Sequence, residues 1–183
     1  MQQPLILLMM TRRNSSESIS DPMKDIKQYS EARNKAIAHI GIAISSSGKI
    51  RDFLSENGYD KDVIEEVIEQ LIEDKYVDDR RYGLKILRSR SGSKAEGRVK
   101  LQARLEAAGV AYDVISELLS KPEYRDENTI LDVINARYPS DSFSSDPAVA
   151  KKELQKAIRY LESRGYPAAL SLASFRKFVD DVE

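Results

Sequence analysis

The sequence contains no cysteine and a single histidine, so two common sources of catalytic and metal-binding chemistry are scarce. Without cysteine there is no disulfide bond and no thiolate nucleophile, and a zinc site built on His39 would need carboxylates as its other ligands. His39 lies in an apolar stretch, AIAHIGIAI, with no paired nucleophile, so we interpret it as a packing or surface residue. We expect no metal, no cofactor and no enzymatic activity.

Long hydrophobic runs are missing as well. The N-terminus has one apolar run, from Pro4 to Met10, which is well below the ~18 residues needed to span a bilayer. The basic residues follow this run, whereas those of a signal peptide precede it. We therefore expect no membrane association and, with cysteine absent, a reducing cytoplasmic location. Residues 11–24 are polar and serine-rich, so residues 1–24 are predicted to form a mobile tail.

Charge is abundant but segregated along the chain. In total there are 29 basic and 30 acidic side chains, which gives a formal net charge of −1. Residues 80–104 nevertheless hold nine basic side chains and one acidic one, Glu96, whereas residues 51–79 hold eleven acidic and three basic ones. Neighbouring segments of opposite charge are informative about partners where the total charge is not. We expect the basic segment to bind a polyanion.

Apolar residues recur at helical spacing through most of the chain. The clearest pattern follows Asp60, where Val63, Val67 and Leu71 interleave with three isoleucines to give a wide apolar stripe. Helices are also predicted over about 25–44, 49–57, 112–120, 126–136, 146–164 and from 167 onward. No segment has the pattern of a strand, so the fold is predicted to be all-α.

A further helix is predicted to follow Asp78 and Asp79. One aspartate is expected to cap this helix and the other to lie near the positive end of its dipole, an interpretation we prefer to a paired-carboxylate catalytic site. Arg81, Lys85 and Arg88 recur at i, i+4 and i+7 and should share one face.

The segment that comes next has a second helix-start signal. Ser93 and Glu96 have the Ser-x-x-Glu spacing of a capping box, in which each side chain satisfies a free backbone donor at the helix start. The spacing predicts that a helix begins at Ser93.

Three glycines, Gly58, Gly109 and Gly165, each follow a leucine by four residues and are predicted to end helices. The unit is a helix, a glycine stop and an amphipathic helix, and it recurs at intervals of about fifty residues. Tandem three-helix repeats of this kind bury faces against their neighbours and form an elongated, curved array of either hand with a long groove. We divide the chain into the tail (1–24), a first repeat with a leading helix (25–92), a second repeat (93–138) and a third (146–183).

Two blocks of the sequence resemble the RecX family of regulatory proteins, the bacterial modulators of the RecA recombinase. The first block is Tyr76–Tyr82 (YVDDRRY), and the second runs from Gly97 through Leu105 to Val110. Their order, their separation and the arginines between them match the family, and the resemblance extends over about residues 37–166. The chain departs from the family pattern at Ser45–Lys49, where the first repeat usually opens with an arginine and an acidic residue.

This resemblance implies a chain of three-helix repeats that binds along the groove of the RecA filament and inhibits filament growth, ATP hydrolysis and strand exchange in DNA repair and recombination. It implies no catalysis by the regulator. We expect a monomer whose partners are the RecA filament and, weakly and without sequence preference, single- or double-stranded DNA. The predicted binding residues are Arg80, Arg81, Lys85, Arg88, Arg90, Lys94, Arg98, Lys100 and Arg104.

Two other functions remain open at this point. A stand-alone DNA-binding or transcriptional module is one, since three-helix units can present a recognition helix to the major groove. The basic residues here are spread over two helices, however, and suit contacts with the phosphate backbone better than base reading. The other is an all-helical scaffold whose charges serve only solubility.

Overall fold

The computed structural model describes residues 22–138 and 147–180, which form helices joined by short loops. Within these ranges the one β pairing is an isolated bridge between Ser45 and Val77. The prediction of an all-α fold is therefore confirmed. Most of the tail predicted at 1–24 and the linker at 139–146 lie outside the described residues.

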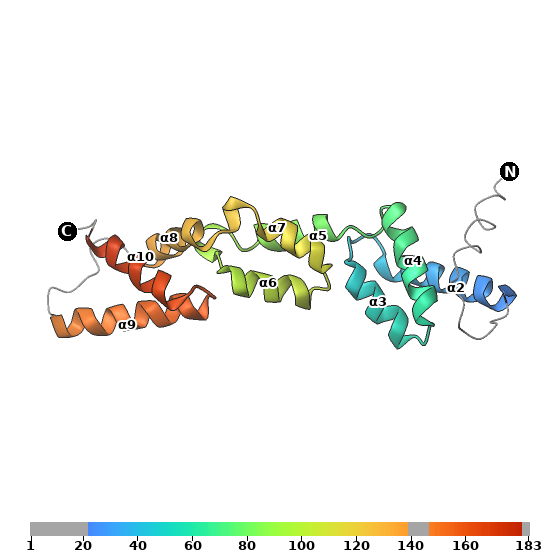
Figure 1. Cartoon of the computed structure of the whole chain (residues 1–183), viewed down its shortest axis with the longest axis horizontal. Coiled ribbons are helices and arrows are strands. Elements are labelled where there is room, and N and C mark those ends of the chain that lie inside the picture. Colours follow the sequence, from blue (N-terminus) through green and yellow to red (C-terminus); the bar gives the residue numbers. More distant parts are fainter. Residues whose placement is uncertain (1–21, 139–146, 181–183) are drawn as a thin grey trace.

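The helices follow one another in three groups of three. In chain order they are α2 (Pro22–Ile40), α3 (Ser47–Glu56), α4 (Lys61–Glu73), α5 (Asp79–Arg88), α6 (Arg98–Ala107), α7 (Tyr112–Leu119), α8 (Asp126–Arg137), α9 (Pro147–Ser163) and α10 (Ala168–Asp180). Two 3₁₀ turns, η1 (Gly92–Lys94) and η2 (Pro122–Tyr124), precede α6 and α8. Figure 1 shows the three groups placed end to end in an elongated row.

Each group has a hydrophobic core of its own. The leucines predicted to precede the helix stops, Leu54, Leu105 and Leu161, are completely buried and belong to the first, second and third core respectively. The cores group α5 with α6 and α7, and α8 with α9 and α10. The sequence division had instead placed residues 79–88 in the first repeat and 126–137 in the second.

The helix stops are made by glycine in the left-handed region of the backbone. Gly58, Gly109 and Gly165 have φ angles of 79°, 72° and 93°, which confirms the helix ends predicted from the sequence. The predicted start at Ser93 is wrong, because α6 begins at Arg98 and its N-cap is Gly97.

The first joint, between the α2–α4 and α5–α7 groups, brings two main chains into direct contact. The Gly48 N–H donates to the Gly109 carbonyl oxygen at 2.9 Å, and a Cβ on Gly48 would lie 2.6 Å from the Gly109 Cα. The buried carboxylate of Asp79, at the start of α5, accepts hydrogen bonds from the Ser47 N–H at 2.7 Å and the Ala111 N–H at 2.9 Å. A polar network at the helix ends therefore holds the groups together.

The second joint, between the α5–α7 and α8–α10 groups, repeats this arrangement. The Gly97 N–H donates to the Arg164 carbonyl oxygen at 2.9 Å, and a Cβ on Gly97 would collide with the carbonyl of Gly165. Asp126, at the start of α8, accepts a hydrogen bond from the Arg98 N–H at 2.6 Å, as Asp79 does from Ser47. The same kind of contact therefore joins neighbouring groups at both joints.

Replacing Gly97 with alanine is expected to open the second joint. Gly97 has a φ of −67°, which alanine adopts without strain, so the cost comes from the clash with the Gly165 main chain. We expect the free energy of unfolding to fall by about 1–3 kcal/mol, measured by urea denaturation. Small-angle scattering should also report a changed shape.

The matched control is Gly41→Ala. Gly41 has a φ of 58° but open space around it, so alanine there costs only about 1–2 kcal/mol of backbone strain and leaves the joints closed. An unchanged scattering profile for Gly97→Ala would contradict the assigned role of this contact.

Candidate polyanion-binding surface

The basic face predicted for α5 is present and points outward. Asp78 caps the helix as predicted, since its carboxylate accepts a hydrogen bond from the Arg81 N–H at 2.8 Å. Gly83 and Leu87 are buried on the inner side of α5. Arg81, Lys85 and Arg88 lie on the opposite side and are exposed. We call these three side chains the α5 basic face.

Within residues 22–138 and 147–180, none of the three side chains of the α5 basic face forms an ion pair. Their neighbour Arg80 does, with its Nη1 atom 2.8 Å from a carboxylate oxygen of Glu117 on α7. Both partners are about half exposed, so this pair is worth little to stability. The α5 basic face is therefore a concentration of positive charge that its own surroundings do not neutralise.

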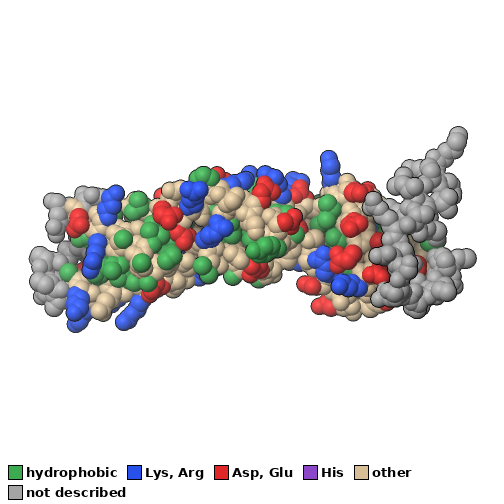
Figure 2. Space-filling model, in the orientation of Figure 1, with side chains coloured by type: hydrophobic (Ala, Val, Ile, Leu, Met, Phe, Trp, Pro, Cys, Tyr) green, Lys and Arg blue, Asp and Glu red, His purple; other side chains and the backbone are tan. Residues whose placement is uncertain are grey.

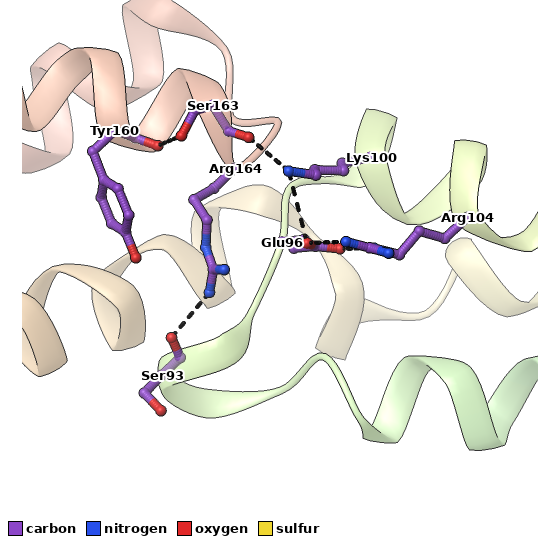
Figure 3. Close-up of polar contacts among 7 residues, drawn as sticks. All are labelled: Ser93, Glu96, Lys100, Arg104, Tyr160, Ser163 and Arg164. Atoms are coloured by element: carbon purple, nitrogen blue, oxygen red, sulfur yellow. Dashed lines mark hydrogen bonds and ion pairs between the residues drawn. The ribbon is translucent and has the colours of Figure 1, made fainter.

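The basic residues of the following segment are placed differently, because several of them are used inside the protein. Glu96 is 2% exposed, and one of its oxygens accepts a hydrogen bond from the Arg104 Nη2 atom at 2.8 Å while the other accepts from Arg104 Nε. The Lys100 Nζ atom lies 3.9 Å from the same carboxylate and donates to the Ser163 carbonyl oxygen at 2.8 Å (Figure 3). Lys100 therefore links α6 to the end of α9.

This network explains why the predicted capping box does not form. A buried carboxylate gains more from two parallel hydrogen bonds with a guanidinium than from a single backbone N–H. Glu96 accordingly pairs with Arg104, eight residues further on, and not with Ser93. The Ser93 carbonyl oxygen instead accepts a hydrogen bond from Arg164 Nη2 at 3.1 Å, across the second joint (Figure 3).

The same network lowers the pKa of Glu96. Burial opposes ionisation of the carboxyl group, but the hydrogen bonds from Arg104 and the charges of Arg104 and Lys100 outweigh burial and bring the pKa below its ordinary value of 4.5. Glu96 is therefore ionised at neutral pH and offsets part of the positive charge of α6.

The other predicted binding residues fall between these two cases. Arg98 donates from its guanidinium to the carbonyl oxygen of Leu119, while Arg90 is half-buried and Lys94 is exposed. The structure thus gathers Arg81, Lys85 and Arg88 on one face but leaves Arg98, Lys100 and Arg104 engaged in contacts within the chain. The assignment of all nine as binding residues stays a prediction.

The sequence analysis did not predict one exposed basic residue that lies next to the α5 basic face. The Lys49 Nζ atom, on α3, donates to the Tyr82 hydroxyl on α5 at 2.7 Å and lies 5.1 Å from the centre of its ring. Lys49 therefore brings a positive charge from the first group to the side of α5. No local pattern could have indicated this, because the two residues are far apart in the sequence and meet across the first joint.

Figure 2 shows Lys and Arg side chains gathered along the upper edge of the middle of the molecule, with acidic side chains among them. In the acidic segment, Glu65 on α4 pairs with Arg51, whose Nε atom lies 2.7 Å from its carboxylate.

In the described part of the chain no three His, Cys, Asp or Glu residues come together to hold a metal ion. No described helix is long and apolar enough to span a membrane.

Known proteins with similar sequences include several named regulatory protein RecX. No family model matches the chain. A protein of Pelodictyon phaeoclathratiforme called regulatory protein RecX is 38% identical over 86 residues, which cover 47% of this chain and 54% of that protein. A regulatory protein RecX of Clostridium perfringens is 28% identical over 151 residues, covering 82% of this chain and 69% of the relative. The chain is similar to these regulatory proteins RecX.

Solved structures of RecX proteins show the same fold. The crystal structure of RecX from Lactobacillus salivarius superposes with a TM-score of 0.64 at 17% identity, covering 85% of this chain and 98% of that one. A second RecX crystal structure gives a TM-score of 0.56 at 14% identity, with 96% and 85% covered. The chain spans about half of the length of the Pelodictyon relative.

Glu96→Gln is expected to weaken the network at the second joint. Removing the charge leaves Arg104 without its ionic partner and should lower the free energy of unfolding by about 1–3 kcal/mol at neutral pH. Because the folded pKa is lowered, the contribution of Glu96 is present above pH 4.5 and is lost as pH falls through the folded pKa. Urea denaturation over a pH series checks this.

The control is Glu69→Gln, at an exposed glutamate of α4 that has no ion pair in the described residues. It should leave stability unchanged at every pH. If the stability difference between the wild type and Glu96→Gln did not shrink on acidification, the network would not depend on the charge of Glu96.

Proposed function

We propose that this protein binds RecA–DNA filaments and inhibits recombinase activity, namely filament growth, ATP hydrolysis and strand exchange, in DNA repair and recombination. Similarity to proteins named regulatory protein RecX supports a regulatory role without catalysis. The observation that carries the proposal is the α5 basic face, three outward-pointing bases without ion pairs in the described residues, at the middle of an elongated row of helical groups.

The elongated shape supports binding along a filament. A row of helical groups presents a long surface that can follow a spiral groove, whereas a compact ball of the same size contacts only a small area. Individual exposed ion pairs contribute only ~0–1 kcal/mol, so an interaction of this kind needs contacts spread over several groups. Lys49 beside the α5 basic face extends the positive surface from the second group to the first.

The exposed basic side chains are suited to sequence-independent contacts with phosphates. Lys49, Arg81, Lys85, Arg88 and Lys94 are exposed and free of ion pairs among the described residues. Neutralising ~5 phosphates predicts a slope of log K against log salt of about −4.5 on duplex DNA and about −3.5 on a single strand. Because the proposed partner forms on bacterial DNA, the proposal includes a cytoplasmic location.

Co-sedimentation over a salt series tests the proposal directly. The full chain is mixed with ATP-bound RecA filaments in one set of tubes and with bare DNA in the other. We expect stronger retention by filaments than by DNA alone, together with slower ATP hydrolysis by RecA. Tight binding to one DNA sequence without RecA would instead support a stand-alone DNA-binding module.

Reversing two charges of the α5 basic face is expected to weaken inhibition without unfolding the protein. Arg81→Glu combined with Lys85→Glu removes two phosphate contacts and should reduce the magnitude of the salt slope by about 1.8 on duplex DNA or about 1.4 on a single strand. The loss should appear as a higher concentration needed to inhibit RecA ATP hydrolysis, while the circular dichroism spectrum stays the same.

Arg176→Glu combined with Lys177→Glu is the matched control. Both residues are exposed on α10 and have no ion pair in the described part of the chain, and the net charge changes by the same amount. This variant should inhibit as the wild type does. Equal inhibition by the wild type and the α5 variant would remove the α5 basic face from the proposal.

A further inference from the structure

Two arginines in the third group lie against a single tyrosine ring. The guanidinium carbon of Arg137, the last residue of α8, lies 4.1 Å from the centre of the Tyr160 ring on α9. The guanidinium carbon of Arg164, which directly follows α9, lies 5.8 Å from the same centre. We call these three side chains the Arg–Tyr–Arg cluster. None of them belongs to the binding residues predicted from the sequence.

Secondary structure and packing bring the cluster together. Tyr160 and Arg164 are four residues apart at the end of α9 and so share one side of it. Arg137 reaches them because Ile134 of α8 and Leu161 of α9 are buried in the same core. Arg164 is held in place by its 3.1 Å hydrogen bond from Nη2 to the Ser93 carbonyl oxygen (Figure 3).

The cluster carries positive charge that the described residues do not neutralise. Neither guanidinium lies within ion-pair distance of a carboxylate in residues 22–138 and 147–180. Attraction to an aromatic face is worth about 0.5–2 kcal/mol per cation, but the two guanidinium groups repel each other. Lys94, which directly follows Ser93 in the chain, is exposed and adds a third positive charge. Such a site favours an anion.

The planar groups of the cluster narrow the choice of anion. An arginine stacked on a tyrosine offers a flat guanidinium surface on which an unpaired base can stack, and its remaining N–H groups can donate to a phosphate. Arg137 is exposed and Tyr160 is half-buried, so the cluster can be reached from solvent, and the centre of the Tyr138 ring lies 5.9 Å from the guanidinium carbon of Arg137. The bases of a duplex are stacked on one another and cannot use such a surface.

We propose that the Arg–Tyr–Arg cluster is a stacking site for an unpaired base of single-stranded nucleic acid. The base stacks on the guanidinium of Arg137, which Tyr160 holds flat, and Arg164 and Lys94 attract the adjoining phosphates. This site is separate from the α5 basic face and goes beyond the proposed function, because it requires exposed bases and not a recombinase.

Comparing oligonucleotides with and without bases tests the site. The full chain is titrated, by fluorescence anisotropy, against a labelled oligothymidylate of about 16 nucleotides and an abasic strand of the same length and charge. Stacking one base should make the wild type bind the oligothymidylate at least about fivefold more tightly. In Arg137→Lys, which keeps the charge but loses the planar group, we expect this preference to disappear while affinity for the abasic strand is retained.

Arg176→Lys makes the same exchange at an exposed arginine of α10 and should preserve the preference for bases. Tyr160→Leu should abolish it, and circular dichroism checks that this variant is folded; if it is not, Arg137→Lys decides the outcome. The proposal is overturned if the wild type fails to bind the oligothymidylate, binds both strands equally, or keeps its preference in Arg137→Lys. RecA inhibition by the same variants is measured separately, so that failure here is distinguishable from failure of the filament proposal.

Discussion

The contact between main chains at the two joints is the constraint on which the rest of this structure depends. Gly48 meets Gly109 and Gly97 meets Gly165 so closely that a single added carbon at Gly48 or Gly97 would collide with the facing backbone. An aspartate at the start of the next group accepts a backbone hydrogen bond at each joint. Because helix ends meet in this way, the groups keep separate cores and line up in a row (Figure 1).

The joints also decide which basic side chains are available to a partner. The segment from Glu96 to Arg104 lies at the second joint, where a buried carboxylate holds Arg104 and a carbonyl oxygen of the next group holds Lys100. The α5 helix begins at the first joint, where Asp79 and Leu87 on its inner side are buried, so its basic side chains project outward. A strip of charge that is continuous in the sequence is therefore divided between an internal network and an open face.

Local signals in the sequence were reliable where neighbouring residues alone set the conformation. The positive φ of Gly109 follows from the ease with which glycine adopts the left-handed region, and the Asp78 cap follows from the free N–H groups at a helix start. The capping box at Ser93 was wrong because Glu96 had a stronger partner in Arg104. A local motif fails where a residue outside the motif forms a stronger interaction with the same side chain.

The sequence by itself determined the all-helical class, the three glycine helix stops, the recurrence of buried leucines and the outward direction of Arg81, Lys85 and Arg88, since each depends on residues within one or two helical turns. Only the tertiary structure decided that α5 packs with α6 and α7, that Lys49 meets Tyr82 and that two arginines gather on Tyr160. These contacts join residues from different helices, and their partners are fixed by how the groups pack and not by spacing along the chain.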